Sequence, residues 1–278
     1  MEKISCPICN SIDNKKPFLS LKDRFSLNDS INFTLTKCKC DFIFLNPRPQ
    51  ENHISKYYTN KNYTSHNKKS VFYSLLQKIS FAWKERLIKK YIDSKDSLLL
   101  DYGSGKGEFA TYLNNKNYNV DTFEPILQNK STDNKLANKK YDLIMLWHSI
   151  EHIHDINPAL LNICNMLNKN GVLIIACPNI DAIEKKYFNT NWVAYDAPRH
   201  LYHFNLKSIN SLLGKHSFKV QKTKNMYQDT FYNIYLSSKL TSYSTLRFII
   251  VLFLVSIESL FNYSKNASSN IYICKNIK

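Results

Sequence analysis

The chain has 278 residues, of which 44% are hydrophobic and 13% aromatic, so it can form a core and is not generally disordered. The formal net charge is +16, but the basic residues are spread out without a dense cluster, and we do not expect a nucleic-acid partner. No apolar run reaches the ~20 residues of a membrane-spanning helix, and the first residues lack an apolar signal core. We therefore expect a cytoplasmic protein with one large domain and a small appendage.

The first 40 residues hold four of the seven cysteines, in the two pairs Cys6 with Cys9 and Cys38 with Cys40. Without a secretion signal, paired cysteines are typical of zinc ligands rather than of disulfides. Zinc prefers four thiolates in a tetrahedral arrangement, and the first pair has the usual spacing. The second pair has one intervening residue where two are usual. We predict a structural zinc on these four cysteines in a segment over 1–60; reduced cysteines without a metal are the alternative.

A linker over 61–95 joins this segment to a main domain over 96–278, and apolar side chains at helical spacing predict a helix over 70–92. The main domain opens with an apolar run over 98–100, which is typical of a strand buried on both faces. Three of the five glycines in the chain follow it, at Gly103, Gly105 and Gly107. Glycine permits positive φ and lets a ligand approach the backbone closely. We therefore predict a strand, a ligand-binding loop and a helix.

The spacing of the glycines separates three kinds of loop. A phosphate-binding P-loop requires G-x-x-x-x-G-K-[ST], which is absent, and a dinucleotide fingerprint requires G-x-G-x-x-G, whereas the spacing here is G-x-G-x-G. A second predicted strand over 118–123 ends before Glu124, and an acidic residue about 20 positions after the first strand suits ribose hydroxyls. A tight turn without a ligand is the remaining alternative.

The G-x-G-x-G loop after Asp101 resembles the S-adenosylmethionine loop of class I methyltransferases. The resemblance implies that Asp101 and the loop face the methionine part of the cofactor, and that Glu124 binds its ribose. The loop residues concerned are Gly103, Ser104, Gly105 and Gly107.

Further strands are predicted over 141–146, 172–177, 218–226 and 271–274. One helix is expected between Asn157, as its N-cap, and Gly171 at its end, and another over 206–215. This pattern predicts a doubly wound, Rossmann-like α/β sheet with its ligand at the carboxyl ends of the strands. Only 16 residues, 125–140, separate the second strand from the third, where class I methyltransferases usually place two helices and an edge strand. We predict a shortened edge that lacks part of the adenine pocket.

Trp147 and His148 follow the strand over 141–146 and are expected to line the cofactor pocket. His148, Glu151 and His152 also match the H-x-x-E-H pattern of a metallopeptidase, in which two histidines on one helix hold zinc. Their place at a strand end favours the pocket. The stretch resembles quinol O-methyltransferases, which have a glutamate at the position of His148 and use the carboxylates for magnesium.

The loop over 192–204 concentrates side chains that can transfer protons, and in this topology it lies over the catalytic mouth. We expect His200 or His203 to act as a general base, with Tyr195 and Tyr202 as further catalytic residues. A polar loop without a catalytic role is the alternative. Residues 246–261 are strongly apolar but too short to span a membrane. They form either a core helix inserted before the last strand or a contact with a membrane near a lipid-linked substrate.

Together these motifs resemble class I methyltransferases with an N-terminal zinc clip, which commonly act in bacterial surface-polysaccharide or other sugar-linked pathways. The resemblance implies methyl transfer from S-adenosylmethionine to a hydroxyl or carbon of a sugar or nucleotide-sugar substrate, with peripheral attachment to the inner face of the membrane as an option. Two alternatives stay open: a non-catalytic scaffold that keeps the fold, and an RNA or protein methyltransferase, which only the net charge favours.

Overall fold

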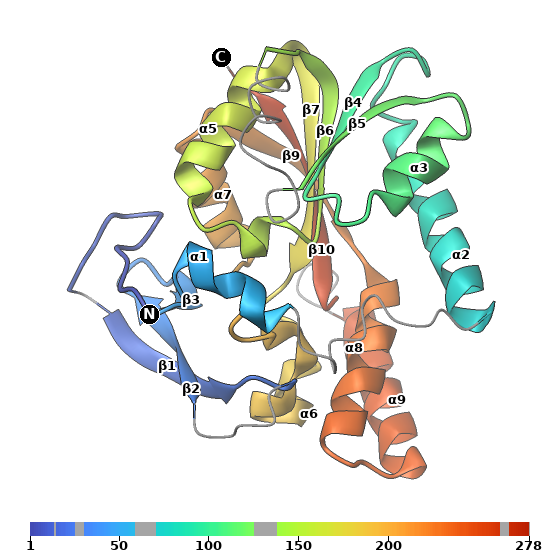
Figure 1. Cartoon of the computed structure of the whole chain (residues 1–278). Helices are drawn as coiled ribbons and strands as arrows, with labels where there is room; N and C mark the ends of the chain where they lie inside the picture. Colours follow the sequence, from blue (N-terminus) through green and yellow to red (C-terminus); the bar gives the residue numbers. More distant parts are fainter. Residues whose placement is uncertain (14, 26–30, 59–70, 125–137, 262–266, 278) are drawn as a thin grey trace.

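A computed structural model describes residues 1–13, 15–25, 31–58, 71–124, 138–261 and 267–277 (Figure 1). Its main element is a six-stranded sheet in the order β5-β4-β6-β7-β10-β9. Strands β4, β5, β6 and β7 are parallel, and β10 runs antiparallel to both of its neighbours. The strands are β4 (Leu98–Tyr102), β5 (Asn119–Phe123), β6 (Tyr141–Trp147), β7 (Leu167–Pro178), β9 (Phe218–Asn225) and β10 (Ser269–Asn276). The predicted Rossmann-like α/β sheet is confirmed.

Helices cover both faces of this sheet (Figure 1). On one face lie α2 (Val71–Ile88) and α3 (Glu108–Asn114), and on the other α5 (Ile156–Met166) and α7 (Leu206–Gly214). Successive residues of a strand point to opposite faces, so Leu143 packs in the core beneath α2 and α3, while Ile144 packs in the core beneath α5 and α7. Burial on both faces explains why the central strands read as unbroken apolar runs.

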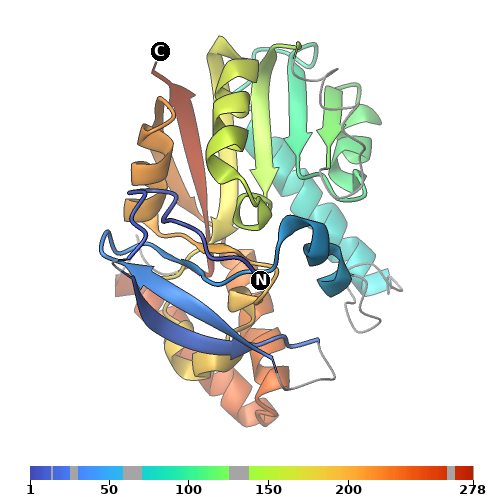
Figure 2. The ribbon, with the colours of Figure 1, turned by 60° about the vertical axis from the view of Figure 1, so that its left-hand side comes forward.

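A second sheet lies beside one end of the first (Figure 2) and has the order β1-β2-β3-β8. Three of its strands come from the predicted N-terminal segment: β1 (Lys15–Lys22), β2 (Asn32–Cys38) and β3 (Ile43–Leu45). The fourth, β8 (Tyr202–His203), comes from the loop expected over the catalytic mouth, and it pairs antiparallel with β3. The N-terminal segment therefore shares a sheet with the main domain.

The remaining helices connect these sheets or extend from them. Short helices are α1 (Glu51–Ile54), η1 (Ser55–Tyr57), η3 (Ile150–His152), α6 (Lys185–Phe188), η4 (Asn189–Asn191) and η5 (Val193–Tyr195). Two longer helices, α8 (Tyr227–Leu240) and α9 (Thr245–Phe261), form a hairpin between β9 and β10 that extends beyond the end of the sheet (Figure 1). Among the described residues, none of the helices combines the length and apolar character needed to cross a bilayer.

Two predicted helix boundaries are wrong. Helix α5 starts at Ile156 rather than after Asn157, because the Asn157 side chain is engaged elsewhere: its amide donates to the Pro7 carbonyl at 3.1 Å. The helix ends at Met166, not Gly171, since Leu167 already begins β7. Gly171 lies inside that strand, where an added Cβ would come within 3.0 Å of the Tyr141 carbonyl oxygen. Close strand packing, and not a helix cap, requires glycine there. The predicted shortened edge falls largely on 125–137, outside the described residues.

Candidate active site and cysteine cluster

The glycine loop turns at the carboxyl end of β4. Gly103, Gly105 and Gly107 have φ of +77°, +55° and +69°, which L side chains rarely adopt. A Cβ on Gly103 would come 2.3 Å from the Cβ of Ser149, whereas a Cβ on Gly105 would meet nothing within 4 Å. Packing therefore requires glycine at 103, while the loop is open to an approaching ligand at 105.

Hydrogen bonds tie this loop to the end of β5. The N–H groups of Gly103 and Ser104 both donate to the Phe123 carbonyl, at 2.7 and 3.1 Å. The N–H of Gly105 donates to the Glu124 carboxylate at 2.8 Å. The acidic residue expected after the second strand thus lies at the rim of the loop.

Asp101 is buried in β4 beside the loop, and a lysine from α2 lies near it. Burial raises the pKa of Asp101 to about 6; the charge of Lys84 opposes this effect and that of Glu124 adds to it. The Lys84 ammonium lies 4.6 Å from the ring centroid of Trp147. Burial lowers the pKa of Lys84, while the charges of Asp101 and Asp229 raise it. Lys84 thus brings a positive charge to the Trp147 ring and near the Asp101 carboxylate.

His148 follows β6 in a left-handed conformation with φ of +52°. Its Nε2 lies 2.9 Å from a carboxylate oxygen of Asp229, and its Nδ1 lies 3.5 Å from one of Glu151. Burial disfavours the imidazolium, but the two carboxylates outweigh burial and raise the pKa of His148 to about 10. The ring is therefore charged at neutral pH and cannot act as a base. Because η3 begins only at Ile150, His148 and His152 do not share a helix, and the metallopeptidase interpretation is wrong.

Glu151, His152 and His200 form a cluster next to this pair, with one ligand atom from each within 4.8 Å of the others. The Nδ1 of His200 lies 2.8 Å from the Ala194 carbonyl, and the Nδ1 of His152 lies 2.9 Å from the Arg199 carbonyl. A carbonyl only accepts, so in the neutral rings Nδ1 carries the proton and Nε2 a lone pair. Both histidines can therefore accept a proton or bind a cation.

Burial and the neighbouring charge of His152 keep the ring of His200 neutral. Burial, with the charge of His152, lowers the pKa of His200 to about 4, so its ring is neutral above that pH. Glu151 is fully buried, and neither carboxylate oxygen has a hydrogen-bond partner among the described residues. Burial opposes its ionisation, but His148, His152 and His200 outweigh burial and lower the pKa of Glu151 to about 2. The cluster thus carries one buried negative charge.

The other three residues predicted as catalytic lie outside this cluster. The Tyr202 hydroxyl donates to the His154 carbonyl at 2.8 Å, within the core beneath β3. His203 is buried on β8, its ring centroid 6.4 Å from that of His200, and burial lowers its pKa to about 3. Tyr195 packs edge-on against His203 at 5.9 Å. Of the four, His200 alone contributes to the cluster.

A buried arginine holds the loop in place. Arg199 is fully buried, and its guanidinium lies 2.7 Å from Asp23 and 2.8 Å from Asp196. Asp23 follows β1, so this contact joins the N-terminal sheet to the loop that carries His200. Burial would lower the pKa of Arg199, but the two carboxylates outweigh it and raise this pKa further.

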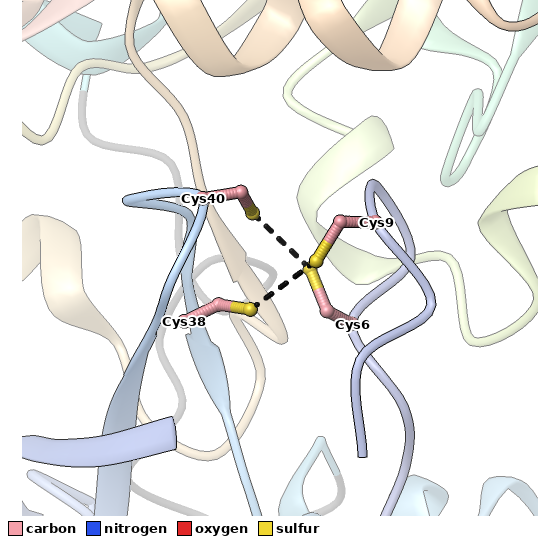
Figure 3. Close-up of side chains that lie close together, drawn as sticks. All are labelled: Cys6, Cys9, Cys38 and Cys40. Carbon is pink, nitrogen blue, oxygen red and sulfur yellow. Dashed lines mark hydrogen bonds between the residues drawn. The ribbon is translucent and has the colours of Figure 1, made fainter. Parts of the chain in front are cut away.

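The four N-terminal cysteines converge (Figure 3). Their Sγ atoms lie within 4.8 Å of one another, with Cys6 3.6 Å from Cys40 and Cys9 3.4 Å from Cys38. A tetrahedron with Zn–S bonds of about 2.3 Å has edges of about 3.8 Å, so this set fits zinc. The short second pair poses no obstacle, because it lies in the β2–β3 turn, where Asp41 has φ of +70°.

Sequence reasoning missed two residues of the pocket, Lys84 and Asp229. Lys84 is one of 38 basic residues and lies in a predicted helix far from the loop in sequence. Asp229 is in the first turn of α8, about 80 residues after His148. No local pattern separates either residue from the surface charges around it, so only their tertiary contacts reveal them.

Comparison with known proteins identifies the domain. A family profile described as a methyltransferase domain matches residues 68–223, more than half of the chain. A ubiquinone biosynthesis O-methyltransferase of Rickettsia bellii is 28% identical over 114 residues, which cover 34% of this chain and 48% of the relative. The corresponding enzyme of Rickettsia typhi is 26% identical over 140 residues, covering 41% and 57%. The chain spans about half the length of the curated relatives it matches.

Two solved structures share the fold in part. A SAM-dependent methyltransferase from Archaeoglobus fulgidus has a TM-score of 0.46 and 16% identity, covering 74% of this chain and 100% of that one. A mycolic acid cyclopropane synthase has a TM-score of 0.47 and 14% identity, covering 72% and 85%. The profile match extends over the glycine loop, His148 and the His200 cluster, and on this basis the chain belongs to the methyltransferase domain family.

Proposed function

We propose that the chain transfers a methyl group from S-adenosylmethionine to a hydroxyl or carbon of a sugar or related small molecule, in surface-polysaccharide biosynthesis. The observation that carries the proposal is the cofactor-type loop and the His200 cluster at the same end of one sheet. The cofactor supplies an electrophilic methyl group on a sulfonium. The sugar acceptor rests on the motifs described above, and the relatives named as O-methyltransferases favour oxygen over carbon.

The charged groups around the loop suit such a cofactor. Gly105 leaves the loop open to a ligand, and Glu124 at its rim would accept hydrogen bonds from the ribose. The amino-acid end of the cofactor is a zwitterion, and the pocket offers one charge for each of its ends. Lys84 would bind the carboxylate, and Asp101 the ammonium group.

His200 is the base we assign for a hydroxyl acceptor. Its Nδ1 is bound to the Ala194 carbonyl, so Nε2 would take the proton from the acceptor as the methyl group arrives. The buried charge of Glu151 would stabilise the imidazolium that forms. His152 would hold the acceptor hydroxyl through its own Nε2.

We also propose that Cys6, Cys9, Cys38 and Cys40 bind a structural zinc ion. Support comes from the convergence of the four sulfur atoms and from the small size of the sheet they adjoin. The ion would hold the β2–β3 turn against the first residues of the chain. Its role would be structural, because four thiolates leave no open coordination position.

Calorimetric titration with S-adenosylhomocysteine tests the cofactor site. We expect micromolar binding that is lost in Asp101→Ala and retained in Asp93→Ala, which alters an exposed carboxylate shortly before β4. Absence of binding to the folded wild-type chain would contradict the proposal and favour a methyltransferase-like scaffold.

Transfer of a labelled methyl group to a panel of nucleotide sugars tests the base. His200→Gln should lower kcat by about 10²–10⁴-fold while leaving the S-adenosylhomocysteine affinity unchanged. His216→Gln, at a histidine 2.8 Å from the Asn157 side chain of α5, serves as the matched control and should have little effect. At saturating cofactor, kcat should be flat near neutral pH and fall as the pH drops toward the His200 pKa of about 4, whereas cofactor affinity should already weaken below the Asp101 pKa of about 6. An unchanged kcat in His200→Gln would contradict this assignment.

A further inference from the structure

The α8–α9 hairpin exposes large apolar side chains along one face. Leu246 is 68% exposed, Ile249 54% and Phe253 63%, and Ile250 and Ile257 continue the row. These positions recur every three or four residues, which places them on one side of α9. The opposite side of the helix is buried at Val251 and Val255. Helix α9 therefore carries apolar side chains on its exposed side as well as on its buried side.

Helix α8 extends this apolar surface. Phe231 and Tyr235 are 53% and 40% exposed, and both rings pack edge-on against Phe248 of α9. Figure 1 shows that the hairpin extends away from the six-stranded sheet. We call the exposed apolar side chains of the two helices the hairpin face. An apolar patch of this kind on a soluble domain is typical of an interaction site.

The charged side chains of the two helices indicate which kind of partner the hairpin face binds. The two carboxylates of the hairpin, Asp229 and Glu258, are paired with His148 and Lys186, which leaves Lys239 and Arg247 as its cations. Lys239 lies 4.4 Å from the ring centroid of Tyr235, and Arg247 lies 3.8 Å from that of Tyr243. Cations and tyrosines at the edge of an apolar face are typical of helices that lie in a membrane interface. A second copy of the chain, with its own charge of +16, would instead be repelled.

We propose that the hairpin face docks on an anionic lipid surface, with α9 lying in the plane of the interface. Leu246, Ile249 and Phe253 enter the acyl boundary, while Lys239 and Arg247 contact the lipid phosphates. Asp229 in the first turn of α8 is paired with His148 of the candidate active site, and Ser237 accepts a hydrogen bond from the Val193 N–H at 3.0 Å. Docking therefore fixes the mouth of that site relative to the lipid.

Co-sedimentation with vesicles of phosphatidylglycerol and phosphatidylcholine tests the proposal. We expect binding to the mixed vesicles at low salt and little binding to phosphatidylcholine alone. The double variant Ile249→Asp, Phe253→Asp should lower the bound fraction about tenfold or more, because it places two charges in the apolar boundary. Leu161→Asp, at an exposed apolar position of α5, is the matched control and should bind like the wild type.

A second variant gives a direct readout of insertion. Tryptophan at 253 (Phe253→Trp) should shift its emission to shorter wavelength on addition of the anionic vesicles, relative to the wild-type spectrum. S-adenosylhomocysteine titration of each variant reports folding, and it separates failure of this inference from failure of the proposed function. Equal vesicle binding by the wild type and the double variant would overturn the proposal. So would a dimer, seen by analytical ultracentrifugation, that the same double variant abolishes without any vesicle binding.

Discussion

Gly103 and Gly105 are only two positions apart, yet substitution by alanine should lower the free energy of unfolding by different amounts at the two positions. Both residues have positive φ, which costs an L side chain about 1–2 kcal/mol. Gly103→Ala adds a steric conflict, because the new Cβ would lie 2.3 Å from the Cβ of Ser149. Ser149 must then move, and its hydrogen bond to the Tyr102 carbonyl, 2.8 Å in the wild type, is weakened.

These effects can be added for each variant. For Gly103→Ala, backbone strain of about 1–2 kcal/mol combines with about 1–3 kcal/mol for overpacking and the disturbed hydrogen bond. Alanine also restricts the unfolded chain, which raises the free energy of unfolding by about 0.4–1 kcal/mol. We therefore expect Gly103→Ala to lower the free energy of unfolding by about 3 kcal/mol. Gly105→Ala introduces backbone strain without a steric conflict, so it should lower the free energy of unfolding by about 1 kcal/mol. It should still weaken cofactor binding.

Urea denaturation followed by circular dichroism measures both values. The double variant Gly103→Ala, Ser149→Gly removes the colliding atom, so the two substitutions should couple favourably. A free energy of unfolding for Gly103→Ala within about 0.5 kcal/mol of the wild type would refute the packing argument. So would equal losses in Gly103→Ala and Gly105→Ala.

Three further predictions concern charge and metal. Lys84→Met should weaken S-adenosylhomocysteine binding about 10–100-fold in calorimetry, because it removes the cation that binds the carboxylate. Binding of 5′-methylthioadenosine, which lacks this carboxylate, should be unchanged. Equal losses of affinity for both ligands would contradict carboxylate binding by Lys84. Burial raises the pKa of Glu184 to about 7 against the contributions of Ser268 and Trp192, so the folded state favours the neutral acid. Its contribution to stability is complete below the unfolded value near 4.5 and is lost as the pH rises through about 7. Urea denaturation at pH 5 and 8.5 gives the free energy of unfolding at each pH, and Glu184→Gln should reduce the difference between the two values by up to about 3 kcal/mol. An unchanged difference would show that Glu184 does not cause the pH dependence. The purified chain should contain one zinc ion by elemental analysis, and Cys9→Ser or a strong chelator should lower the melting temperature; a metal-free chain that melts at the same temperature as the loaded one would rule out a structural ion.

The sequence alone predicted the sheet, the cofactor-type loop and the acid at its rim. These features depend on neighbouring residues: an apolar run forms a strand buried on both faces, and glycines permit the positive φ of the loop. The four cysteines could be grouped for the same reason, since two short spacings indicate zinc ligands. Helix ends were less predictable, because Asn157 could equally cap its own helix or bind a distant carbonyl.

Only the tertiary structure determined which polar side chains form the site. Lys84, His148 and Asp229 come from three different elements, and their charges meet only when α2 and α8 pack at the end of the sheet. The tertiary structure also separates His200, which lies beside Glu151, from His203, which is buried in the strand that joins the N-terminal sheet. Two histidines three positions apart are equivalent in a sequence pattern. They differ in the fold because pairing of β8 with β3 commits His203 to the core and leaves His200 beside the site.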